Sequence, residues 1–162
     1  MTRMITCKDI SGKTYEVAES ELRWRPSVYG IVIRDGKLLL SKQFGKYDLP
    51  GGGLGLGEKL ENGVVREVKE ETGLDVVNPR LIGIDDSFFR SSHAEDKSYH
   101  SLLVYFVCEY AGGDLSTEGF DEYEKKYAEM AEWIPLEKID NLEIASTVDY
   151  RPHVKRAAAL LT

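Results

Sequence analysis

Three glutamates, Glu67, Glu70 and Glu71, stand at positions that a helix brings onto one flank. At about 100° per residue, their carboxylates share roughly one quarter of the helix surface. Like charges three and four residues apart destabilise an isolated helix, so a compensating positive charge is expected there. Clustered carboxylate oxygens are the ligands that hard divalent cations prefer. The cluster therefore predicts a site for Mg²⁺, with Mn²⁺ as a substitute.

Arg66 stands beside this cluster and precedes Glu70 by four residues. It can pair with Glu70 or with Glu58, but one guanidinium cannot neutralise four glutamates. Gly63 lies one turn ahead of Glu67 on the same flank. Because glycine costs about 1 kcal/mol relative to alanine inside a helix, we interpret Gly63 as space left for a ligand.

Two local patterns position these residues. Five glycines crowd into seven positions, a density that disfavours regular structure and permits positive φ and close backbone approach to a ligand. They are Gly51, Gly52, Gly53, Gly55 and Gly57. Apolar residues then recur at helical spacing until Thr72-Gly73, where a glycine is suited to cap a helix. The stretch therefore predicts a loop followed by a helix of about three turns.

The whole pattern resembles the Nudix box. Gly52, then Glu58, then the run from Arg66 to Leu74 match its defining positions over twenty-three residues without a departure. Three glutamates alone are more often ordinary solvated helix charges, but the full spacing favours the resemblance. It implies an α/β fold, an α/β/α sandwich with a mixed central sheet. It also implies a metal-dependent hydrolase of nucleoside diphosphates linked to a further group.

The resemblance assigns roles around the metal. Glu67, Glu70 and Glu71 are its expected carboxylate ligands, and the Gly51 backbone carbonyl is a further ligand. We count Glu67, Glu70 and Arg66 as catalytic, with Arg66 orienting the glutamates through charge-assisted hydrogen bonds. Glu67 is shared between two roles, metal ligand and general base.

Other residues are expected to contact the substrate. Gly52 and Gly53 shape the shelf for the diphosphate, and Glu58 joins the metal site or braces it. In similar proteins the loop before the last strand can supply another acidic residue, for which Glu129 and Glu132 are the candidates. Most of the acids of residues 116–132 are expected to be solvated.

Composition bounds the rest of the chain. Its 162 residues, 42% hydrophobic and 30% charged, suit one globular domain, residues 1–162, with residues 1–25 as an N-terminal hairpin extension. No stretch is apolar enough to cross a bilayer, and the first residues lack the apolar segment of a signal peptide. We therefore expect a cytoplasmic protein without a membrane partner, in which Cys7 and Cys108 are reduced.

The formal charge of −7 also constrains the partner. Affinity for a nucleic-acid polymer comes mostly from Lys and Arg on phosphates, so such a polymer is not expected. A small nucleoside diphosphate derivative would itself be repelled by an acidic site unless metal ions intervened. Net charge and the glutamate cluster thus predict the same metal-dependent small-molecule site.

The N-terminal segment reads as a hairpin over residues 3–19 around a turn at Ser11-Gly12. Such a hairpin can cover a sheet edge or pair with another subunit to form a homodimer. After it, Trp24 lies between Arg23 and Arg25, groups able to stack on a base and bind phosphate. We favour the alternative that Trp24 packs under a connecting loop.

Further strands are expected on either side of the box. They cover residues 28–33, 37–41, 80–84 and 101–107, then 133–136 as the last strand and its exit, with a turn at Asp35-Gly36. A helix over residues 150–161 is predicted to pack on the face of the sheet opposite the box helix.

Residues 88–100 are predicted to form a loop that contacts the leaving group. Its candidate substrate-binding residue is Arg90, with His93, Tyr99 and His100 as alternatives. A Ser-His-Asp hydrolase is disfavoured because the chain has no G-x-S-x-G nucleophile elbow.

Two other functional classes stay open from the sequence, a nucleotide-sensing module that does not turn its ligand over and a structural protein with an acidic helix. Loss of a box glutamate would favour either, and none is lost. Among substrates, ADP-ribose or another nucleoside diphosphate sugar and a (deoxy)nucleoside triphosphate are preferred over a dinucleoside polyphosphate.

Overall fold

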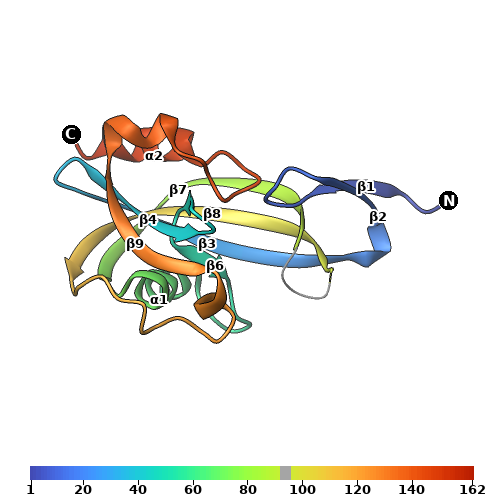
Figure 1. The fold of residues 1–162 in the computed structure, drawn as a ribbon, viewed down its shortest axis with the longest axis horizontal. Helices are drawn as coiled ribbons and strands as arrows, with labels where there is room; N and C mark the ends of the chain where they lie inside the picture. The colour runs from blue at the N-terminus through green and yellow to red at the C-terminus, as the bar shows by residue number, and fades with distance from the viewer. Residues whose placement is uncertain (92–95) are drawn as a thin grey trace.

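The computed structural model describes residues 1–91 and 96–162. Within that part of the chain, nine strands join one mixed sheet between two α-helices (Figure 1). The elements are β1 (Met4–Lys8), β2 (Thr14–Ala18), β3 (Leu22–Arg34), β4 (Lys37–Gln43), β5 (Lys46–Asp48), β6 (Gly51–Gly53), α1 (Leu60–Thr72), β7 (Asp75–Arg90), β8 (Ser98–Gly112), β9 (Ala128–Pro135) and α2 (Arg151–Leu160). The predicted α/β/α arrangement and N-terminal hairpin are confirmed.

The sheet has the strand order β2-β1-β7-β8-β3-β4-β5, with β6 pairing to β3 and β9 to β4. Two strand pairs are parallel, β1 with β7 and β3 with β8, and the other pairs are antiparallel. The β1–β2 hairpin extends from the end of the molecule away from α1 and α2 (Figure 1). Pairing of this hairpin with a second subunit stays a prediction.

Local sequence features determine where several strands and helices end. Asp35 and Gly36 both have positive φ, 49° and 71°, as a two-residue hairpin turn between β3 and β4 requires. Helix α1 ends at Gly73, whose φ of 83° is left-handed and whose N–H donates to the Lys69 carbonyl at 2.9 Å. The predicted turn and helix stop are therefore confirmed.

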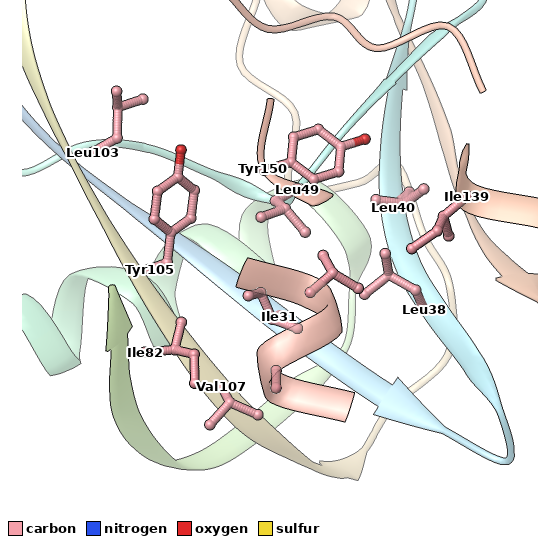
Figure 2. Close-up of a cluster of buried hydrophobic side chains, with 12 residues drawn as sticks. Ile31, Leu38, Leu40, Leu49, Ile82, Leu103, Tyr105, Val107, Ile139 and Tyr150 are labelled. Carbon is pink, nitrogen blue, oxygen red and sulfur yellow. The ribbon is translucent and has the colours of Figure 1, made fainter. Parts of the chain in front are cut away.

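Two apolar layers cover the faces of the sheet. On the α2 face, side chains of β3, β4, β7 and β8 meet Tyr150, Val154 and Ala157 (Figure 2). On the α1 face, Val64 and Val68 pack on the opposite side of the same strands. Alternation along a strand explains this division, because successive side chains point to opposite faces.

Several expected boundaries are wrong. Strands β7 and β8 run to Arg90 and from Ser98, so both ends of the segment 88–100 pair as strands and do not belong to a loop. Gly51–Gly53 is likewise a short strand on β3. The ladder explains both, because backbone pairing to a neighbouring strand outweighs polar or glycine-rich composition. Residues 92–95, and with them His93, lie outside the described part.

Two residues also differ from expectation. Trp24 is 71% exposed and stacks on His100 with ring centroids 4.5 Å apart, so it does not pack under a loop. Gly63 does not leave space for a ligand. A Cβ there would lie 2.6 Å from Leu54 Cδ1 and 3.3 Å from Val28 Cγ2, so this glycine allows close packing of α1.

In the described ranges, no helix has both the length and the apolar character required to span a bilayer.

The contact between α1 and β3 predicts a strong effect at Gly30. A Cβ at this buried position would lie 2.7 Å from Val68 Cγ2, so Gly30→Ala overpacks the core and should lower the free energy of unfolding by about 1–3 kcal/mol. Urea unfolding measures this. Gly55→Ala is the control, because its nearest side-chain atom would be 3.5 Å away. Equal stability of the two variants would contradict the packing argument.

Candidate active site

The acidic flank of α1 faces β6. Strand β6 pairs with β3 through Gly51 opposite Tyr29 and Gly52 opposite Val28. A Cβ on Gly52 would stand 3.0 Å from both carboxylate oxygens of Glu67. Glycine at this position therefore lets the strand backbone approach the carboxylate closely.

Arg66 connects four groups around this contact. Its Nε and Nη2 donate to Glu58 Oε1 and Oε2 at 2.6 and 2.9 Å. Its Nη1 donates to Glu67 Oε1 and Glu70 Oε2, each at 3.0 Å, and Nη2 also donates to the Gly53 carbonyl at 3.3 Å. The hydrogen bonds from Arg66, together with the Gly55 N–H, lower the pKa of Glu58 to about 2. The structure thus joins the three glutamates that the sequence places near Arg66.

Glu71 is the box glutamate that Arg66 does not reach in this network. Its Oε2 accepts a hydrogen bond from the Gly51 N–H at 3.1 Å. Burial, followed by the charge of Glu67, raises the pKa of Glu71 well above its usual value. Burial also raises the pKa of Glu67, which is 8% exposed, although Arg66 opposes this shift. Both carboxyls therefore stand where additional positive charge would be stabilising.

A cavity of about 450 Å³ opens onto these carboxyls. Six of the expected site residues line it, namely Gly51, Gly52, Gly53, Glu67, Glu71 and Glu129. The exposed Glu129 accepts a hydrogen bond from the Gly45 N–H at 3.2 Å. Its alternative, Glu132, instead pairs with Lys42 at 3.1 Å and Tyr47 at 2.8 Å. Of the two expected acids, Glu129 is therefore the one in the cavity.

Other expected residues are outside the cavity lining. Glu58, Arg66 and Glu70 are absent from it and form an ion network with one another. Arg90 is also outside the cavity. Its guanidinium lies over the Tyr15 ring at 5.2 Å and donates to Ser98 Oγ at 3.1 Å, because β7 extends to the N-terminal hairpin.

The two alternatives on β8 that the structure describes are also outside the cavity lining. Tyr99 lies under the Arg25 guanidinium, 6.0 Å from the ring centroid. His100 Nε2 lies 2.9 Å from Asp86 Oδ2, and its ring stacks on Trp24. Neither contacts the carboxylate end of the site.

Sequence reasoning missed Asp48 and Glu124, which both belong to this electrostatic environment. Asp48 lines the cavity at the end of β5, where its Oδ1 accepts the Leu49 N–H at 2.7 Å and burial raises its pKa to about 7. Glu124 also lines the cavity, and burial raises its pKa. Asp48 could have been considered from the sequence, because it stands directly before Leu49-Pro50 and the glycine-rich stretch. Glu124 has no comparable feature in the sequence.

The donor chemistry fits a hard divalent cation. Glu67, Glu71 and the Gly51 backbone offer oxygen atoms to one cavity, and both carboxyls have raised pKa values. Within residues 1–91 and 96–162, no three His, Cys, Asp or Glu groups already stand together as a metal cluster. Glu70 is turned to Arg66 in this arrangement.

The fold and the site together define an α/β/α domain in which a carboxylate-bearing helix lies against a glycine-rich strand. The chain belongs to the NUDIX domain family, whose model matches residues 23–156. This confirms the resemblance that the box predicts.

Curated relatives cover the same region. The chain is 36% identical over 109 residues to an ADP-ribose pyrophosphatase of Methanocaldococcus jannaschii. The aligned region covers 64% of this chain and 61% of the relative. It is 33% identical over 129 residues to the NAD-capped RNA hydrolase NudC of Vibrio atlanticus, covering 76% of this chain and 42% of that one. The chain thus spans less than two thirds of each relative's length.

Solved structures share the fold. A NUDIX hydrolase from Nitrosomonas europaea superposes with a TM-score of 0.65 at 20% identity, covering 85% of this chain and 90% of the other. The NUDIX domain of Shewanella oneidensis NrtR, complexed with ADP ribose, also gives 0.65, at 18% identity and with coverage of 89% and 92%.

The environment of Glu71 predicts a stabilising substitution. Because its folded-state pKa is raised, its contribution to stability is full below about pH 4.5 and is lost as pH rises through that pKa. Glu71→Gln keeps an acceptor for the Gly51 N–H and removes the charge. With EDTA at pH 8, we expect its melting temperature to exceed the wild type by about 2–4 °C.

Glu61→Gln is the matched control, because Glu61 is exposed in the first turn of α1. It should melt like the wild type. A Glu71→Gln protein that melts below the wild type at pH 8 in EDTA would contradict the electrostatic account.

Proposed function

We propose that this protein is a Mg²⁺-dependent pyrophosphohydrolase that cleaves the phosphoanhydride bond of a nucleoside diphosphate linked to another group. The observation that carries the proposal is the meeting of Glu67, Glu71 and Gly51 at one cavity, beside a network in which Arg66 is already shared by Glu58, Glu67 and Glu70. Mn²⁺ replaces Mg²⁺ at such an oxygen site.

ADP-ribose or another nucleoside diphosphate sugar is the first choice of substrate, and a (deoxy)nucleoside triphosphate is the second. The relative named ADP-ribose pyrophosphatase supports this order. The relative named NAD-capped RNA hydrolase acts on RNA by its name, but the formal charge of −7 favours a small molecule here. Acidic residues outnumber Lys and Arg, 28 to 21, and would repel a long phosphate chain.

Some of the residues would bind the metal, and others would position the carboxylates. Glu70 and Glu71, with the Gly51 carbonyl, would hold the metal, and Glu67 would serve as the general base beside them. Once bound, Mg²⁺ supplies positive charge for the diphosphate and lowers the pKa of its water. Arg66 keeps Glu67 and Glu70 in position, since one nitrogen donates to both.

Proton transfer and substrate binding use other atoms of the same cavity. Burial raises the pKa of Glu67, which suits its carboxylate to take a proton from the attacking water. The backbone of Gly52 and Gly53 forms the shelf for the diphosphate. Arg25 takes the place of Arg90 as the cation that contacts the substrate, because Arg25 lines the cavity and its guanidinium can bind phosphate.

A substrate panel tests the reaction. With Mg²⁺ we expect mononucleotide release from ADP-ribose or another nucleoside diphosphate sugar at a kcat/KM at least tenfold above that for NAD-capped RNA, and no release with EDTA. Chromatography of the products measures it. Metal-dependent binding without turnover of any compound in the panel would identify a sensor and contradict the proposal.

Substitutions test the roles of the glutamates. Glu67→Gln should lower the single-turnover rate by about 10²–10⁴-fold with little change in metal affinity, since it removes the general base. Glu70→Gln and Glu71→Gln should weaken metal affinity and lower the rate as well. Metal titration of each variant separates these results, and Glu61→Gln is the control. Full activity of the Glu70 and Glu71 variants would contradict the metal assignment.

A further inference from the structure

The N-terminal hairpin reaches the cavity of the candidate active site. Ile10, in the turn between β1 and β2, lines that cavity together with Phe89 of β7. The match to the NUDIX domain begins at residue 23, so the hairpin lies outside the matched range. An element beyond the family-matched region therefore forms part of the wall of the site.

The turn that carries Ile10 is held by its neighbour Asp9. This carboxyl group, 6% exposed, accepts hydrogen bonds from the Ser11 N–H at 2.9 Å, the Ser11 hydroxyl at 2.6 Å and the Lys13 N–H at 3.1 Å. Its second oxygen accepts the Tyr15 hydroxyl at 3.1 Å. The position of Ile10 is thus defined by a hydrogen-bonded turn.

The hairpin is also anchored to β7. Lys8 of β1 pairs with Phe89, and Ile5, Cys7 and Val17 form a small apolar cluster against Phe88. The guanidinium of Arg90 covers the Tyr15 ring. Together these contacts hold the wall that contains Ile10 against the sheet, and they give Arg90 an anchoring role.

The cavity near the hairpin has an apolar lining with hydroxyl groups. Ile10, Phe89 and Leu103 supply apolar surface, and Ser87 and Ser101 are directly opposite each other on β7 and β8. Ser101 is 2% exposed, and its Oγ has no hydrogen-bond partner among the described residues. A buried hydroxyl without a partner costs free energy, so a ligand group that bonds to it is expected.

This region lies away from the strand that faces the carboxylates. From β7 the sheet passes through β8 and β3 to β6, three steps of about 4.8 Å, or roughly 14 Å. Arg25 of β3 is the register partner of Ser101 and lies between the two ends. A substrate with its diphosphate at β6 therefore extends past Arg25 to the hairpin.

We infer that Ile10, Phe89, Leu103 and Ser101 form the subsite for the nucleobase, and that the N-terminal hairpin thereby determines which nucleoside is accepted. A flat apolar ring with hydrogen-bonding atoms at its edge suits apolar side chains beside a buried hydroxyl. None of these four residues is charged, so the subsite suits a base better than a phosphate. This assignment rests on the proposed function.

The test compares AMP with ribose 5-phosphate, which differ only in the base. Calorimetric titration in Mg²⁺ should show that the wild type binds AMP at least tenfold more tightly. Ile10→Ala and Ser101→Ala should each reduce this preference about tenfold while leaving the affinity for ribose 5-phosphate unchanged. Met4→Ala, an exposed change in the same hairpin, is the control and should keep the preference.

Melting of the ligand-free protein separates binding from folding. Because Ser101 Oγ has no described partner, Ser101→Ala should melt at or above the wild-type temperature. Equal affinity of the wild type for AMP and ribose 5-phosphate, or an unchanged preference in both variants, would overturn the subsite. Such a result in an enzyme that still hydrolyses its substrate rejects the subsite alone. Base-dependent binding without hydrolysis confirms the subsite and rejects the proposed function.

Discussion

The site depends on one guanidinium shared among several carboxylates. Arg66 uses two of its nitrogens on Glu58 and one on both Glu67 and Glu70, which leaves Glu71 with the Gly51 N–H as its partner in this network. Charge compensation is therefore incomplete at the end of the flank that lines the cavity. Burial is the main cause of the raised pKa values of Glu67 and Glu71, and the charge of Glu67 adds to the shift at Glu71. In this view the binding of a cation completes an ion network that the chain itself leaves unfinished.

That network depends on close packing of α1 and β6 at three glycines. Gly30 lets Val68 approach β3, Gly63 lets the helix approach Leu54, and Gly52 lets β6 approach the Glu67 carboxylate. Each position would otherwise place a Cβ within about 3 Å of the opposing atom. These three glycines therefore allow close contact between packed elements, and the carboxylates obtain their geometry from that packing.

The cavity joins surfaces with different chemistry. Its acidic end contains Glu67, Glu71 and Asp48, where burial raises the pKa of each carboxyl, and its other wall contains Ile10 and Phe89. The acidic end lies on family-matched elements, whereas Ile10 lies on the hairpin that precedes the matched range. This division suits a protein in which the reacting groups are common to the family and the recognition of the rest of the substrate is a property of the chain.

The sequence by itself determined the local features. Residue spacing was enough to predict helix α1 and its stop at Gly73, the turn at Asp35-Gly36, the family and the glutamates of the ion network, because each depends on near neighbours in the chain. Only the tertiary structure decided that Gly63 serves packing and that Ile10 and Ser101, ninety-one positions apart, line one cavity. The reason is that strand length and cavity lining depend on pairing between distant segments, and single-residue patterns carry no information about which segments pair.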